Sequence, residues 1–176
     1  DAPIGARLID IAPVQYWVFE IDNKSVNHRP DLWGHYGFAR ELAAIYGREL
    51  RPAAAPVALP ASGRQVAIEI RDAQACARYC GLLIDGVQAG PAPLELRCLL
   101  AAVGQRSINL PVDLTNFVML DLGQPMHAFD AGHVGKGPIV VRRATAKEKL
   151  TTLDGQERKL TEHDLIEHCK TQLTGY

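Results

Sequence analysis

The sequence predicts an α+β fold with a mixed, mainly antiparallel sheet and short packing helices. Helical patterns at 31–47, 92–103 and 114–122 do not alternate regularly with strands of the parallel type, which argues against a doubly wound sheet. In addition, Asp154-Gly155 lies between two short β-prone arms, and this dipeptide is the strongest local signal for a hairpin. Both observations favour local, antiparallel strand pairing.

The composition is that of an ordinary globular protein, with 47% hydrophobic and 22% charged residues among 176. No apolar run approaches the ~18 residues that a bilayer span requires. The net charge is −1, so any RNA contact must be local rather than driven by a protein-wide positive field. The four cysteines include no C-x-x-C, which indicates reduced thiols in a cytoplasmic protein. The start, Asp-Ala-Pro, lacks a signal peptide, and we interpret it as an excision from a longer chain.

The first 50 residues predict one strand and one helix. Residues 16–21 (YWVFEI) have the aromatic and β-branched composition of a strand. Asp31 is placed to cap a helix that ends at Gly47, with apolar residues at three- and four-residue spacing. Gly34 and Gly37 lie inside it, where each costs up to ~1 kcal/mol relative to Ala. We therefore expect either that another backbone segment approaches closely there or that the helix starts after Asp31.

A domain boundary is predicted at 51–63 (RPAAAPVALPASG), a Pro- and Ala-rich linker with no periodic apolar face. Beyond it, 65–71 (QVAIEIR) alternates between apolar and polar residues and predicts a half-buried strand. Residues 80–85 (CGLLID) predict a second strand. Residues 90–104 have prolines near their start and a glycine at their end, a pattern that predicts a helix.

A further helix is expected over 113–123, with Asp113 as its cap and Gly123 as its terminator. Three elements are predicted downstream: a strand at 138–144, a hairpin at 149–160, and a final short helix with Thr161 and Asp164 as a capping box.

Polar residues gather between 109 and 130, at the end of a predicted helix. They are Asp113, Thr115, Asn116, Gln124, His127 and Asp130. Such a group suits a pocket for a small polar ligand. The alternative is structural, with Asp113 and Thr115 as caps, Asn116 in a turn and His127 as a hydrogen-bonded core histidine, and local chemistry alone favours it. The chain has no G-x-S-x-G, phosphate-loop or H-E-x-x-H motif.

The segment DLTNFVMLDLGQPMHAFD (113–130) closely resembles a signature of the beta subunit of bacterial phenylalanine–tRNA ligases. Other segments resemble the same family in the same order: DAPIG at the start, NHRPDLWGHYGFARELAAIYG (27–47), RYCGLLIDGVQAGPAP (78–93), QRSINLPVDLTN (105–116) and VRRATAKEKLTTLDGQERKLTEHDL (141–165). The resemblance covers positions 1 to about 166, and the tail from Ile166 onward resembles no part of the family.

The resemblance implies that residues 1–50 correspond to the closing part of the subunit's amino-terminal domain and residues 64–176 to its tRNA-editing module. Such a module hydrolyses mischarged tyrosyl-tRNA(Phe), because a pocket for Phe rejects the extra hydroxyl of Tyr too weakly by itself. The family's site residues correspond to Thr115 and Asn116, which would bind substrate, and to His127 as the catalytic residue. We assign His127 the positioning of water first and proton transfer second. No metal is implied.

The implied partners are an alpha subunit and tRNA(Phe), with no membrane and no DNA. No cofactor is implied in this chain, because ATP and Mg serve adenylation and charging in the partner subunit. After the counterpart of residue 165 the family continues into an Ala-Gly-Val-Met-Gly-Gly loop and a glutamate that complete the pocket, and neither occurs here. We therefore expect an incomplete pocket and an inactive isolated piece. The alternative function is a non-catalytic part that packs against the catalytic subunit and positions tRNA.

Overall fold

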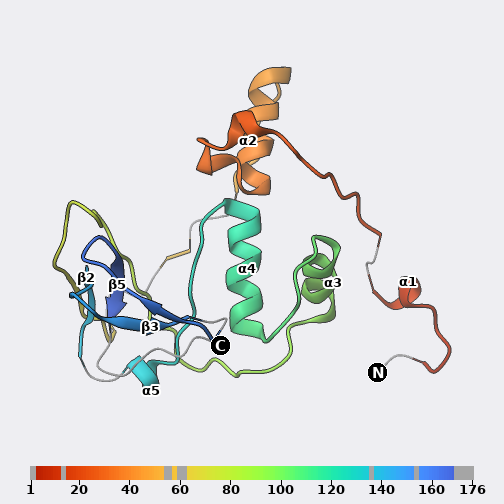
Figure 1. Ribbon diagram of the computed structural model, residues 1–176. Helices are drawn as coiled ribbons and strands as arrows, with labels where there is room; N and C mark the ends of the chain where they lie inside the picture. The colour runs from red at the N-terminus through yellow and green to blue at the C-terminus, as the bar shows by residue number, and fades with distance from the viewer. Residues whose placement is uncertain are drawn as a thin grey trace. The chain divides into compact units, whose positions relative to one another are not determined.

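The computed structural model describes residues 3–12, 15–53, 57–58, 63–134, 137–152 and 155–168 (Figure 1). The chain forms two compact units, and each unit is built from two separate stretches. Residues 1–58 and 87–128 make the first unit, and residues 59–86 and 129–176 make the second. The sequence predicts a boundary at 51–63 between two modules of the related family, and this boundary stays a prediction. The described residues of that linker belong to no helix or strand, and 54–56 and 59–62 lie outside the described residues.

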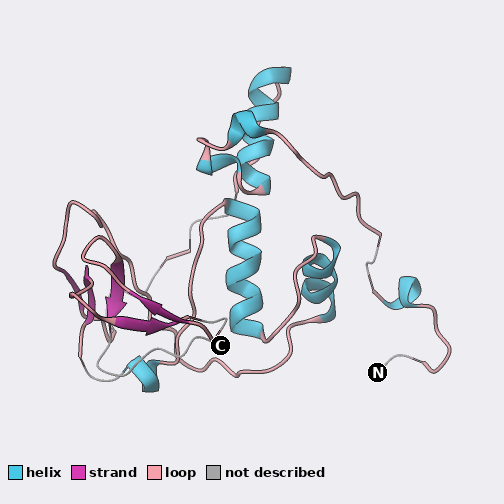
Figure 2. Ribbon diagram, in the orientation of Figure 1, coloured by secondary structure: helices cyan, strands magenta, loops and turns pink. Residues whose placement is uncertain are grey.

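The predicted α+β class is confirmed (Figure 2). The first unit contains α1 (Leu8–Ile11), two 3₁₀ turns (Lys24–Val26 and Pro30–Leu32), α2 (His35–Tyr46), α3 (Leu94–Ala102) and α4 (Leu110–Leu122). The second contains β1 (Ile68–Ile70), α5 (Ala131–Val134), β2 (Ile139–Arg143), β3 (Lys149–Thr151), β4 (Glu157–Lys159) and β5 (Leu165–His168). None of the helices in the described ranges combines the length and the apolar character needed to cross a membrane.

The start of α2 explains two glycines. The helix begins at His35 rather than Asp31, because Pro30–Leu32 forms a separate 3₁₀ turn and Gly34 is an extended N-cap. Both expectations for the glycines are therefore confirmed. A Cβ at Gly34 would overlap the backbone nitrogen of Gly123, and a Cβ at Gly37 would overlap the carbonyl oxygen of Asp31. Close backbone packing thus joins the start of α2 to the end of α4.

The start of α4 differs from the prediction. The helix begins at Leu110, and its N-cap is Asn109, whose Oδ1 accepts a hydrogen bond from the backbone N–H of Val112 at 3.1 Å. The assignment of Asp113 as the cap is wrong, because this residue lies inside the first turn and is fully buried. The predicted end is confirmed, since Gly123 adopts a left-handed φ of 75° that glycine tolerates without strain.

The second unit is organised around β2. This strand pairs in parallel with β1 and antiparallel with β5. Its Ile139 and Val141 are buried, which matches the predicted strand at 138–144. β3 and β4 form a separate antiparallel ribbon and confirm the hairpin at 149–160, although Asp154 lies outside the described residues.

Three predicted elements are wrong. Residues 16–21 and 80–85 form no strand, and the chain after Thr161 continues into β5 instead of a helix. A strand needs a neighbour for its backbone hydrogen bonds, and local composition does not specify one. The Thr161 N–H and hydroxyl do donate to the Asp164 carboxylate, at 2.7 and 3.0 Å, as in a capping box. Pairing with β2 then makes the following residues a strand.

Candidate functional site

The two predicted substrate-binding residues lie side by side near the middle of α4, and both are half-buried. The Thr115 hydroxyl donates to the carbonyl oxygen of Val112 at 2.8 Å, so its hydrogen is used within the helix and only its oxygen can serve a ligand. The Asn116 carboxamide makes no hydrogen bond to any of the described residues. It therefore keeps both a donor and an acceptor for a ligand.

A buried carboxylate fixes the helix next to these residues. One oxygen of Asp113 accepts a hydrogen bond from Ser107 Oγ at 2.6 Å, and the other accepts from the backbone N–H of Ile108 at 2.8 Å. These bonds satisfy the carboxylate, whose burial would otherwise be costly. Together with the Asn109 cap, they attach the segment before α4 to its first turn. Sequence reasoning missed this role, although the position of Asp113 four residues after a capping Asn is consistent with it.

His127, the predicted catalytic residue, follows α4 on an irregular segment and is exposed. It is therefore not a core histidine, and this part of the structural alternative is wrong. After α4 the chain reverses direction (Figure 1). Asn116 lies six residues before the end of α4, about 9 Å along its axis, whereas five extended residues reach roughly 17 Å. The segment is thus long enough to bring His127 back to the level of Asn116.

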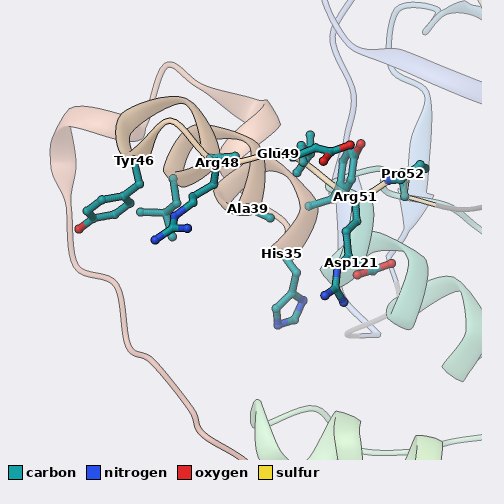
Figure 3. Close-up of a pocket in the computed structure, with 13 residues that line it drawn as sticks. His35, Ala39, Tyr46, Arg48, Glu49, Arg51, Pro52 and Asp121 are labelled. Carbon is teal, nitrogen blue, oxygen red and sulfur yellow. The ribbon is translucent and has the colours of Figure 1, made fainter.

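A pocket of about 490 Å³ lies elsewhere in the first unit, along α2 and the residues that follow it (Figure 3). Most of its lining residues are apolar or aromatic, and its charged residues have both signs: Arg48 and Arg51 are basic, and Glu49 and Asp121 are acidic. The side chains of His35, Arg48 and Arg51 extend to the same side (Figure 3). None of the three predicted site residues lines it. The pocket is therefore distinct from the predicted editing site.

No group of three or more His, Cys, Asp or Glu side chains in the described part of the chain is placed to hold a metal ion. The three described cysteines, Cys76, Cys80 and Cys98, are not in disulfides. The chemistry that Thr115, Asn116 and His127 can supply is hydrogen bonding and proton transfer.

Comparison with known proteins adds a family to this geometry. The B3/4 domain family model matches residues 75–174, a range that includes Thr115, Asn116 and His127. The match also extends beyond Ile166, so the interpretation of the tail as unlike the family is corrected. Part of that tail, up to His168, forms the pairing strand β5.

The chain is also similar to proteins named phenylalanine–tRNA ligase beta subunit. It is 43% identical over 166 residues to the subunit of Solibacter usitatus, which covers 94% of this chain and 21% of that protein. The subunit of Geobacter metallireducens is 44% identical over 168 residues, and that of Carboxydothermus hydrogenoformans is 40% identical over 166, with the same two coverages. The chain thus spans about a fifth of the length of the curated relatives it matches. Since the family model covers more than half of its residues, the chain belongs to the B3/4 domain family.

Proposed function

We propose that this chain is part of a phenylalanine–tRNA ligase beta subunit and carries residues of a site that hydrolyses mischarged tyrosyl-tRNA(Phe). The similarity to proteins of that name supports the subunit. One structural observation supports the site: the half-buried Asn116 carboxamide has no hydrogen-bond partner in the described structure, and it lies on the helix whose following segment carries the exposed His127. A polar group that is partly desolvated and unpaired is suited to meet a ligand.

In this proposal the three residues divide the work on the ester. Asn116 donates to the carbonyl oxygen of the tyrosyl ester, where negative charge develops. Thr115 accepts a hydrogen bond from the substrate's amino group. His127 positions a water molecule for attack on the carbonyl carbon and, as its second role, accepts the proton of that water. The bond between the carbonyl carbon and the ribose oxygen breaks, the ribose oxygen takes a proton, and tyrosine and tRNA(Phe) leave.

We further propose an alpha subunit and tRNA(Phe) as partners, and the cytoplasm as the location. The word "beta" in the relatives' names supports a partner subunit. Adenylation and charging, with ATP and Mg, are assigned to that partner. The non-catalytic, tRNA-positioning function remains the competing proposal.

The test is His127→Ala in the complete beta subunit assembled with its alpha subunit. Loss of one positioned catalytic group commonly lowers a rate by ~10²–10⁴, and we expect that loss in tyrosyl-tRNA(Phe) hydrolysis with phenylalanine charging near normal. His133→Ala is the matched control, because His133 is also exposed and lies nearby in the sequence, on α5. Hydrolysis by His127→Ala at the wild-type rate would contradict the catalytic assignment and favour the tRNA-positioning function.

A further inference from the structure

The β3–β4 ribbon in the second unit contributes nothing to the apolar core. All six of its paired residues are exposed. Three are basic, namely Lys149, Arg158 and Lys159, and one, Glu157, is acidic. A two-stranded ribbon without a buried face gains little stability from its own pairing. Its surface chemistry is therefore the feature that needs an explanation.

The register of the ribbon places two like charges opposite one another. Lys149 pairs with Lys159 across the two strands. Directly opposed like charges destabilise an antiparallel pair. Glu157 offsets part of this repulsion, because its carboxylate lies 2.6 Å from the Lys149 ammonium. Lys159 has no such carboxylate among the described residues.

Glu148, the acidic residue at the base of the ribbon, already forms an ion pair with Arg142, which lies outside the ribbon. The Arg142 guanidinium makes two hydrogen bonds to the Glu148 carboxylate, at 2.8 and 3.0 Å, and their side chains are 18% and 21% exposed. This arginine, together with the Thr145 N–H, lowers the pKa of Glu148 to about 2. Residues 147–159 hold four basic and three acidic side chains, including Asp154 outside the described residues. Because Arg142 balances the charge of Glu148, the four basic residues of this segment face two remaining acidic residues, and its net charge is +2.

Lys147, next to this ion pair, has a φ of 67°. It is the one non-glycine residue with positive φ in the ranges that the structure describes. Glycine or asparagine adopts this conformation at lower cost than lysine. The hydrogen bond from the Thr145 N–H to Glu148, at 2.8 Å, holds the turn in which it lies. Lys147 is exposed and adds one more ammonium group at the base of the ribbon.

We propose that the β3–β4 ribbon, with Lys147 at its base, binds the phosphate backbone of tRNA. Phosphates between Lys149 and Lys159 would remove the repulsion that the register creates, and a chain with a net charge of −1 needs a local basic element to contact RNA. The identity of the RNA rests on the proposed function, whereas the binding of phosphates rests on the ribbon.

The key variant is Lys159→Gln in the assembled synthetase, because it removes the opposed charge and leaves the ion pair between Lys149 and Glu157 in place. One lost phosphate contact should weaken binding of uncharged tRNA(Phe) about 5- to 10-fold at ~0.1 M salt, and should reduce the slope of log K against log salt by roughly 0.7–0.9. Thermal stability should be unchanged or higher, because the repulsion is gone. Lys159→Arg should bind as the wild type does. The double variant Lys147→Gln with Lys159→Gln should lose two phosphate contacts, so its affinity and its salt slope should fall further than those of Lys159→Gln.

The control removes the same two charges as the double variant, but elsewhere: Arg48→Gln with Arg51→Gln, both in the first unit and both lining the α2 pocket. We expect wild-type affinity for this control. Unchanged binding by Lys159→Gln would overturn the proposal, and so would an equal loss in the control or weaker alpha-subunit assembly without weaker tRNA binding. The binding assay uses uncharged tRNA, so it does not depend on hydrolysis. If the wild-type synthetase fails to hydrolyse tyrosyl-tRNA(Phe), the proposed function fails while the ribbon's role is still decided by the binding data.

Discussion

Three polar residues of one short sequence, DLTN, have three different environments. Asp113 is buried and bonded to the preceding segment, Thr115 bonds to its own helix, and Asn116 makes no side-chain hydrogen bond to the described residues. Successive residues of a helix point about 100° apart, so neighbours in sequence need not share a pocket. The sequence predicted one polar cluster, which stays a prediction as a ligand site, and it could not assign an environment to each member.

The role of Asp113 can be measured through stability. Asp113→Ala leaves the Ile108 N–H and the Ser107 hydroxyl without their acceptor. Both hydrogen bonds are part-buried, so each donor costs less than a fully buried unsatisfied group, which costs about 1–3 kcal/mol, because water can reach it. We expect the free energy of unfolding of the first unit to fall by about 1–3 kcal/mol. Asp113→Asn should cost less, because its amide oxygen can accept from Ile108 and its amide nitrogen can donate to Ser107.

Urea unfolding followed by tryptophan fluorescence checks this prediction, since the two tryptophans of the chain, Trp17 and Trp33, both belong to the first unit. Equal losses in the alanine and asparagine variants would show that the acceptor geometry of Asp113 does not matter.

At the scale of elements, the sequence predicted what local signals determine. The glycine-terminated helices α2, α3 and α4 and the ribbon were found because helical spacing, terminating glycines and a turn dipeptide act over a few residues, although the predicted caps Asp31 and Asp113 were wrong. The strands were less predictable: β5 exists because β2 provides an edge, whereas the β-prone residues 16–21 have no pairing partner in the described structure. Strand pairing is non-local, so composition cannot decide it.

The junction between the 3₁₀ turn and α2 offers a prediction at this scale. In Gly37→Ala the added Cβ meets the carbonyl oxygen of Asp31, a backbone atom that cannot rotate away. Overpacking of this kind costs about 1–3 kcal/mol or more, and we expect that loss in the urea unfolding of the first unit. Gly90→Ala is the matched control in the same unit, because no atom lies within 4 Å of the position that its Cβ would take and its φ is not left-handed. A Gly37→Ala variant as stable as Gly90→Ala would contradict the close approach.

At the scale of the whole molecule, both units are assembled from two separate stretches of chain, so neither can be cut out as one continuous piece. The described buried apolar residues are few and mostly small or β-branched, such as Ala12, Ala92 and Val141. Large apolar side chains, in contrast, are exposed in runs. Trp17, which is 92% exposed, and Phe19, which is 81% exposed, lie in one such run. Apolar surface of this kind normally lies against another protein surface.

We therefore expect the 176-residue chain, prepared as it stands, to self-associate. Trp17→Ser with Phe19→Ser should lower the average mass measured by light scattering at high concentration, because the variant removes the two most exposed aromatic side chains of the run. Ile4→Ser is the control, since Ile4 is fully exposed but lies between a proline and a glycine, outside any apolar run. A monomeric mass for the wild-type chain at every concentration would contradict the prediction. Equal association in the double variant and the control would instead assign the contact to other exposed residues, of which Leu82 and Ile84, each 65% exposed, are the next candidates.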